Sequence, residues 1–313
     1  MSPPAPSPNG DILFAFLSIV LEGAPYILLG TLISGFIDAY LPGNIIERIL
    51  PKRPFFAVLM AGLLGGFFPV CECAVVPVIR RLVKKGLPLS CAITYMLSAP
   101  IINPVVVIST LSAFKGQGAV FMTCSRLLMA YFVTVLVGLL VSRLRAENVL
   151  RASVMAGGDS LHTHATGSHD VRVRHALRTT MTDFLDTAMY FTIGVLITAV
   201  FNTQLMVKPG FQEHFSALAH NDWLAVPGLM ILAAILSLCS TTDAFIAATL
   251  QGFSWVSKLA FLVFGPMVDL KLVFMYSSVF KKAFVAKLVI GLFALVALFA
   301  FIWKALGPLI HGN

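Results

Sequence analysis

The sequence predicts an all-α membrane protein of about eight transmembrane helices, arranged as two parallel repeats of four helices. Hydrophobic residues make up 58% of the 313 residues and charged residues only 12%, whereas a soluble domain carries about 25% charged residues. The hydrophobic residues also form separate runs, each long enough for the roughly 20-residue helix that crosses a bilayer. These two observations indicate a polytopic protein embedded in the lipid bilayer.

The predicted crossings are residues 12–37, 55–80, 88–112, 118–142, 181–203, 223–250, 256–279 and 282–307. An even number of crossings places both termini on one side of the membrane. That side would also hold the basic residues that follow the second and fourth runs, which include Arg80, Arg81, Lys84, Lys85, Arg143 and Arg145. Since basic loops favour the cytoplasm, the termini are predicted to be cytoplasmic. The net charge of +8 then reflects orientation and not binding of nucleic acid.

A polar and basic segment, residues 143–180, divides the chain into a first transmembrane repeat (1–142) and a second one (181–313). The segment contains four histidines, namely His162, His164, His169 and His175. One interpretation is a flexible connector. The other is a weak zinc- or copper-binding tract, because His-rich runs can bind these metals.

The two halves resemble each other in the positions of unusual residues. At an offset of 164 residues the first helices match at a tyrosine, a glycine and an acid, which pair Tyr26 with Tyr190, Gly30 with Gly194 and Glu22 with Asp186. At an offset of 166 residues Cys73 meets Cys239, Pro100 meets Pro266 and Asn103 meets Asp269. We infer a duplicated unit of four helices. Four crossings in each unit would make the repeats parallel.

The second and third helices of each half are predicted to be broken. Glycine and proline interrupt three of the runs near their centres, at residues 65–77, 98–104 and 265–269, and the polar residues 237–243 take the matching place in the fourth. Each proline removes a backbone donor and clashes with the preceding turn. Irregular backbone at bilayer depth is tolerated only where it is buried in protein or lines a cavity. Four broken helices that meet at the midplane are typical of a transporter binding site.

Three cysteines are candidate ligands for a soft metal or metalloid. Cys71 and Cys73 flank an acid in the first half, and Cys239 takes the matching place in the second. Thiolates suit Cu(I), Zn and other thiophilic species. Cys71 and Cys73 would face one ligand only if the helix is broken between them. The alternative is that these residues are small apolar packing groups, as we expect for Cys91 and Cys124.

Charged and polar groups in the apolar runs are further candidates. The candidate coupling or ion-pair residues are Glu22, Glu72, Asp186, Asp243 and Lys271, and the candidate substrate-binding residues besides the cysteines are Glu72, Pro100, Asn103, Thr242, Asp243 and Asp269. A charge at the bilayer centre costs about 2.5–3.5 kcal/mol on the insertion scale, so each needs a partner or a role. Lys271 could pair with Glu72, Asp243 or Asp269, either as a structural ion pair between the halves or as part of a proton- or cation-coupling site.

The run 69–82 (PVCECAVVPVIRRL), followed by 84–88 (KKGLP) and 99–104 (APIINP), resembles the bacterial predicted permeases of the YraQ/YcgR type. That family also contains the ArsP organoarsenical efflux permeases. The resemblance covers essentially the whole chain and implies eight helices with a central loop in the bacterial cytoplasmic membrane. It is strongest to the YcgR-type branch, whose members are often described as one subunit of a two-component permease. For ArsP relatives it implies thiol-dependent efflux of trivalent organoarsenicals.

Two hypotheses follow. The protein is a secondary permease that moves a small solute, such as a thiophilic metal or metalloid species, through a midplane site. The alternative is a membrane subunit of a two-component permease complex without transport of its own. The sequence has no phosphate-binding glycine loop, HExxH or GxSxG, so neither an enzyme nor a bound cofactor is expected. An ion gradient is the expected source of energy.

Overall fold

The computed structural model describes residues 8–40, 50–51, 53–66, 71–155, 169–206 and 221–311. The described elements are helices apart from one isolated bridge between Leu150 and Phe280. Four helices are long and apolar enough to cross a membrane: α1 (Pro8–Tyr40), α7 (Ala119–Val141), α10 (His169–Met206) and α16 (Lys282–His311). The prediction of an all-α, multi-pass membrane protein is confirmed.

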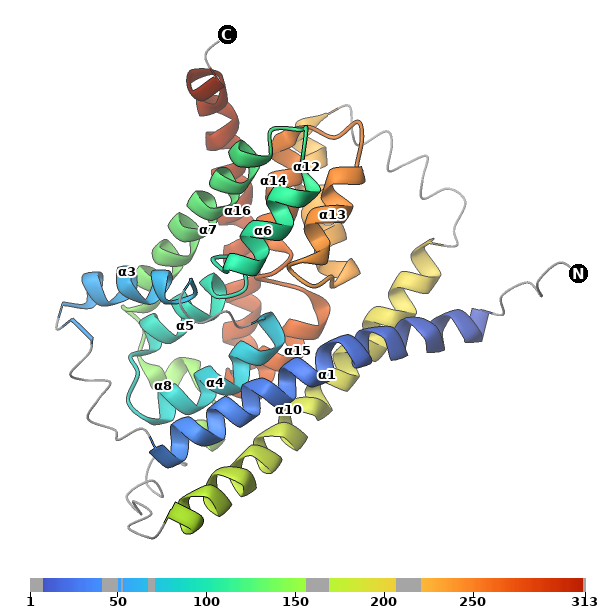
Figure 1. The fold of residues 1–313 in the computed structure, drawn as a ribbon. Coiled ribbons are helices and arrows are strands. Elements are labelled where there is room, and N and C mark those ends of the chain that lie inside the picture. The colour runs from blue at the N-terminus through green and yellow to red at the C-terminus, as the bar shows by residue number, and fades with distance from the viewer. Residues whose placement is uncertain are drawn as a thin grey trace, which may run out of the picture.

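The other predicted crossings are each divided into two shorter helices (Figure 1). The pairs are α3 (Pro54–Leu64) with α4 (Glu72–Lys84), α5 (Leu89–Ser98) with α6 (Pro104–Ala113), α12 (Asp222–Leu236) with α13 (Thr242–Thr249), and α14 (Trp255–Phe264) with α15 (Leu270–Val279). The breaks therefore lie in the second and third segments of each half, as predicted. Side chains cap the new ends, because Asn103 accepts from Val105 N and Asp269 from Leu272 N.

The first pair, α3 and α4, turns back on itself. Along α3, the Leu59 carbonyl accepts a hydrogen bond from the Tyr131 hydroxyl of α7 (3.3 Å), and the end of the helix at Gly65 contacts Ala99 in the break between α5 and α6. Leu50 before α3 and Leu87 after α4 pack against the same small cluster of buried residues. The chain therefore returns to the side from which it came, in place of the crossing predicted for residues 55–80.

The descending arm of this hairpin, α4, lies beside α1. Gly30 contacts Ala74, Ser34 Oγ donates to the Pro77 carbonyl (3.3 Å), and Lys85 Nζ donates to the Asp38 carbonyl (2.6 Å). Residue numbers rise together along both helices, so α1 and α4 are parallel. The end of α4 consequently lies at the same side as the end of α1.

The second pair, α12 and α13, is also a hairpin, but it enters from the opposite side. Asp222 at the start of α12 pairs with Lys304 near the end of α16 (2.5 Å). Beyond α13, Trp255 packs against Phe121 at the start of α7, with ring centroids 5.1 Å apart. Both contacts lie at the side where α16 ends and α7 begins. This hairpin takes the place of the crossing predicted for residues 223–250.

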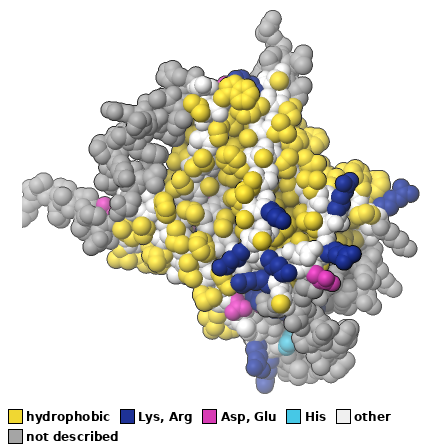
Figure 2. Space-filling view, turned by 180° about the vertical axis from the view of Figure 1, so that it is seen from behind, with side chains coloured by type: hydrophobic (Ala, Val, Ile, Leu, Met, Phe, Trp, Pro, Cys, Tyr) yellow, Lys and Arg dark blue, Asp and Glu magenta, His cyan; other side chains and the backbone are white. Residues whose placement is uncertain are grey.

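We name the two sides of the molecule by what they carry. The terminal side holds the start of α1 and the end of α16. The basic side holds the ends of α1, α4 and α7, with Arg81, Lys85 and Arg143. Figure 2 shows most of the basic side chains of one face gathered low, below a broad hydrophobic area. Termini and basic residues were predicted on one side. The hairpins, by removing one crossing from each half, place them on opposite sides.

The entry of the two hairpins from opposite sides also bears on the predicted repeat. Parallel repeats would place matching segments in the same direction, whereas these two hairpins run in opposite directions. Internal duplication itself remains a prediction. The predicted linker is partly helical, because α8 (Ala146–Val149) and α9 (Ala152–Met155) lie in it and α10 already begins at His169. His162 and His164 lie outside the described residues.

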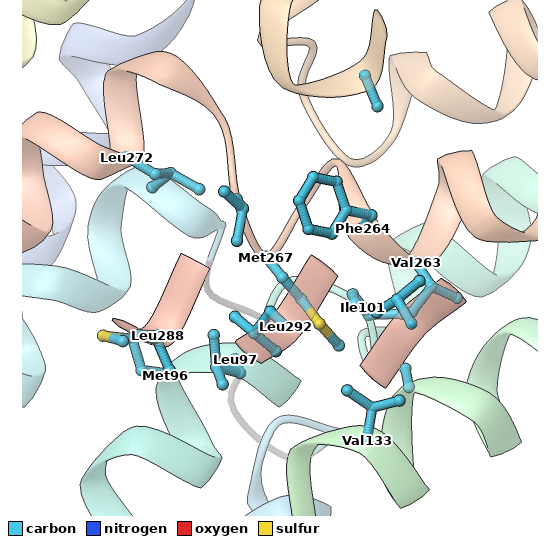
Figure 3. Packing of buried hydrophobic residues seen from close by; sticks show 14 of the residues in the cluster. Met96, Leu97, Ile101, Val133, Val263, Phe264, Met267, Leu272, Leu288 and Leu292 are labelled. Atoms are coloured by element: carbon cyan, nitrogen blue, oxygen red, sulfur yellow. The ribbon is translucent and has the colours of Figure 1, made fainter. Parts of the chain in front are cut away.

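The two halves share one packed core. Figure 3 shows Met96 and Leu97 of α5 and Val133 of α7 facing Phe264 of α14 and Leu292 of α16. All five side chains are buried. This core holds the α5–α6 and α14–α15 breaks at the centre of the molecule. The tips of both hairpins meet beside these breaks.

Candidate functional site

The tip of the first hairpin places two thiols and a carboxylate on a break in the helix. Cys71 has extended backbone (φ −73°, ψ 167°) and immediately precedes α4, which Glu72 begins. A regular helix would point Cys71 and Cys73 in nearly opposite directions. The extended conformation at Cys71 removes that restriction. Glu72 lies where the helix dipole favours a negative charge.

The tip of the second hairpin is formed by the residues between α12 and α13. Ser237 ends α12 in a left-handed conformation (φ 49°), which is uncommon for a residue other than glycine. The chain then passes through Cys239 and Ser240 to α13. Ser240 Oγ donates a hydrogen bond to Glu72 Oε2 (3.1 Å). The two hairpins therefore touch directly at their tips.

A partly open pocket lies against both tips. It is lined by Ile19, Glu22, Gly23, Tyr26, Cys71, Glu72, Cys73, Phe191, Cys239 and Lys271. The three cysteines singled out in the sequence thus share one pocket, together with three of the predicted charged residues. α1 and α10 form its outer wall.

The thiols surround this pocket without forming a closed ligand cage. Cys73 is buried, while Cys71 and Cys239 are partly exposed, and all three are free thiols. No three His, Cys, Asp or Glu side chains in the described ranges are arranged to hold a metal ion. Cys91 packs in a small apolar cluster and Cys124 is exposed on α7, so neither reaches the pocket.

Lys271 stands at the centre of the buried charges. Its Nζ donates to the Ser237 carbonyl (2.9 Å) and lies 3.5 Å from both Glu72 Oε1 and Asp269 Oδ2. Each of these three charged side chains is at most 5% exposed. Of the pairings proposed for Lys271, those with Glu72 and Asp269 are present. Asp243 has another partner.

That partner is Arg126 of α7, which the sequence analysis missed. Arg126 Nη2 contacts Asp243 Oδ2 (2.8 Å) and the Ser240 carbonyl (3.2 Å), and Nη1 donates to Thr110 Oγ1 (2.9 Å). The Arg126 side chain is 1% exposed. A lone arginine inside the apolar run 118–142 was the available signal, because an arginine at bilayer depth needs an acidic partner.

The buried charges match the ends of the half-helices. Glu72, Asp243 and Asp269 lie at the starts of α4, α13 and α15, where backbone N–H groups favour an anion. Lys271 and Arg126 bind the carbonyls of Ser237 and Ser240, which the break after α12 leaves free. Broken helices buried in protein are expected to be satisfied in this way.

The remaining predicted site residues lie away from the pocket. Pro100 is buried in the break between α5 and α6, and the Asn103 side chain caps α6. Thr242 is exposed. Asp186 pairs with Arg80 (3.1 Å), and its side chain is 50% exposed. The structure brings none of these four to the pocket.

The helices that form this pocket lie within a region shared with a known protein family. A family model described as "Predicted permease" (ArsP_1) matches residues 10–305, which include all of the helices that build the pocket. The chain belongs to this permease family.

Two relatives of the permease cover most of both chains. UPF0718 protein YcgR of Bacillus subtilis is 38% identical over 275 residues, 88% of this permease and 90% of the relative. The "Putative two-component membrane permease complex subunit" of Streptococcus mutans is 35% identical over 286 residues, 91% of this permease and 92% of the relative. No solved structure matches the permease.

Proposed function

We propose that this permease moves a small thiophilic solute, a metal or metalloid species, through the pocket at the hairpin tips. The observation that carries the proposal is the presence of three thiols, from both hairpins, on one pocket in a chain of a permease family. Thiolates are soft ligands that select soft ions. A pocket that gathers such ligands from two separable elements suits a solute that must be bound and then released.

The Lys271 ammonium supports this chemistry. It lines the same pocket as the three sulfurs, so its positive charge would offset part of the negative charge that the thiols acquire when they bind a soft ion. The sulfurs do not hold a bare ion as they stand. A solute large enough to span the pocket would contact all three sulfurs. A closing movement of the tips would bring a smaller solute into the same contact.

We propose Glu72 as the acid that couples transport to an ion gradient. Around the hairpin tips, three buried carboxylates pair with two buried cations. Lys271 pairs with both Glu72 and Asp269, and Arg126 pairs with Asp243. Of these three buried carboxylates, only Glu72 lines the pocket, and it contacts both Lys271 and the second hairpin. Protonation of Glu72 would remove its ion pair with Lys271 and weaken the hydrogen bond from Ser240, which would loosen the contact between the tips.

Transport measurements on cysteine variants test the solute site. Replacing Cys71, Cys73 and Cys239 with serine should abolish efflux or uptake of the solute, found by elemental analysis of cells exposed to a panel of metals and metalloids. Cys91→Ser with Cys124→Ser is the matched control, because these thiols lie outside the pocket. Normal transport by the triple variant would contradict the proposal.

The coupling role is tested separately with Glu72→Gln. This variant keeps an oxygen to accept the Ser240 hydrogen bond but cannot be ionised. Uptake into vesicles should lose its response to an imposed proton gradient while solute binding remains. A full response in Glu72→Gln would exclude Glu72 as the coupling acid.

The alternative is that the chain is one subunit of a two-component permease. The printed name of the Streptococcus mutans relative favours it. So does α1, because only 11% of its most apolar window is buried, and the remainder could contact a second subunit or lipid. Mild detergent extraction that yields a stoichiometric partner, with no transport by the chain alone in vesicles, would support this alternative.

We further propose a location in the bacterial cytoplasmic membrane with the basic side in the cytoplasm. Arg80, Arg81, Lys85, Arg143 and Arg151 lie at that side in the structure, and basic loops mark the cytoplasmic face. The termini then lie outside, opposite to the orientation inferred from the sequence. Two hairpins entered from opposite sides favour inverted repeats, as in many secondary transporters.

A further inference from the structure

On the basic side of the pocket, a cluster of buried ions joins α1, α4 and α10. Arg81 Nη2 lies 2.7 Å from Asp183 Oδ2, and Arg81 Nη1 lies 3.5 Å from Asp38 Oδ2. Lys85 Nζ donates to the Asp38 carbonyl (2.6 Å), and Ser34 Oγ donates to Asp183 Oδ2 (3.1 Å). We call Asp38, Arg81, Lys85 and Asp183 the Arg81 cluster. The side chains of its four members are 11% exposed or less.

Close backbone contacts seal the space between the pocket and this cluster. A Cβ atom at Gly30 would lie 2.5 Å from the Ala74 carbonyl of α4, and one at Gly35 would lie 2.6 Å from the Ala176 carbonyl of α10. Ile27, which lies between the pocket and these glycines on α1, is 1% exposed. Between the pocket and the Arg81 cluster, the described parts of α1, α4 and α10 are therefore in close contact.

In the other direction the pocket is open. Glu22 and Tyr26 line it and are exposed, Tyr26 by 47%. Both precede the sealed part of α1, and α1 runs from the terminal side to the basic side. The exposed part of the pocket wall thus lies nearer the terminal side than the sealed part of α1.

We propose that the Arg81 cluster is the gate of the permease on the basic side, closed in this structure. The same three helices carry pocket residues and cluster residues, so separating α4 from α1 and α10 would open the pocket to the basic side. None of the cluster side chains lines the pocket, which separates the gate from the solute site. The proposal rests on the proposed path through the pocket and not on the identity of the solute.

The chemistry of the cluster suits a gate that opens. Arg81 has two carboxylate partners and Asp38 also contacts Lys85, so each charge is paired while the gate is closed. The cluster lies at the ends of α1 and α4, where water could solvate the separated charges when it opens. A permanent brace between helices, in contrast, would not control access to the pocket.

The native thiols of the pocket can report on access. In a Cys91→Ser, Cys124→Ser background only Cys71, Cys73 and Cys239 remain, and all three line the pocket. Right-side-out and inside-out membrane vesicles are treated with a membrane-impermeant thiosulfonate, and labelling is followed by mass spectrometry. A separate Arg145→Cys variant, exposed at the basic side, shows which preparation presents that side.

The parent should be labelled at least about tenfold more slowly from the basic side than from the terminal side. Removing one partner of a buried ion pair strongly destabilises the closed arrangement, so Arg81→Gln should raise the basic-side rate about tenfold or more. Lys304→Gln, which removes the half-exposed pair with Asp222, is the matched control and should change nothing.

Equal labelling of the parent from both sides would overturn the proposal. An unchanged basic-side labelling rate in Arg81→Gln would also overturn it. If Arg81→Gln does not fold, the same measurement on Asp183→Asn decides. The solute site is judged independently. If the serine variants of the pocket cysteines transport normally while Arg81→Gln raises labelling from the basic side, the proposed gate is supported and the proposed thiol site is refuted.

Discussion

Replacement of Arg126 tests how strongly the second hairpin is fixed to the first half. Arg126→Met removes the contacts to Asp243 Oδ2 (2.8 Å), Thr110 Oγ1 (2.9 Å) and the Ser240 carbonyl (3.2 Å). Asp243, whose side chain is 3% exposed, would remain as a buried carboxylate without its cation. Breaking a buried pair in this way costs about 3–5 kcal/mol, so we expect a loss of that size in the free energy of unfolding.

The loss can be measured by equilibrium unfolding in mixed micelles with increasing dodecyl sulfate, followed by tryptophan fluorescence. Adding Asp243→Asn to Arg126→Met removes the unpaired charge and should recover about half of the loss or more. Lys304→Met is the control. Its pair with Asp222 has side chains 48% and 21% exposed, and such pairs contribute about 0–1 kcal/mol. A cost below about 1 kcal/mol for Arg126→Met, or simple additivity in the double variant, would refute the reasoning.

Two further predictions concern packing and the cap of α15. Gly30→Ala would place a Cβ 2.5 Å from the Ala74 carbonyl and should lower the free energy of unfolding by about 1–3 kcal/mol. Gly291→Ala, with nothing within 4 Å, should be neutral or slightly stabilising in the same unfolding assay. Asp269→Asn keeps the oxygen that caps α15, whereas Asp269→Ala loses it and should be less stable than Asn by about 1 kcal/mol. Equal stability of the two Asp269 variants would show that the cap contributes nothing.

Much of the local structure could be predicted from the sequence. Proline and glycine located three of the breaks in the second and third segments of the two halves, and the polar run 237–243 located the fourth. The direction of the chain after a break could not be predicted, because two half-helices such as α3 and α4 can continue one crossing or turn back with the same composition. The deciding contacts, such as those of Gly65 with Ala99 and of Leu50 and Leu87 with one cluster, join residues distant in sequence.

The candidate site was also predicted only in part, because it too depends on contacts between residues distant in sequence. Cys71, Cys73 and Cys239, which the sequence placed at two of the predicted breaks, line one pocket. Asn103 and Asp269 were interpreted as candidate substrate ligands, but both cap a half-helix, and that use depends on where the helix begins. Asp38 and Asp183 were passed over because they lie near the ends of their apolar runs, where acids are common.

The contact between the hairpin tips also has a consequence for biosynthesis. Ser240, which donates to Glu72, follows it by 168 residues. At about 5–20 residues per second, the first hairpin is complete roughly 10–30 s before its partner leaves the ribosome. A hairpin can wait at the membrane surface with its carboxylate in water, whereas a crossing helix would hold that charge in lipid. The two tips can therefore meet only late in the synthesis of this permease, after most of the chain has been made.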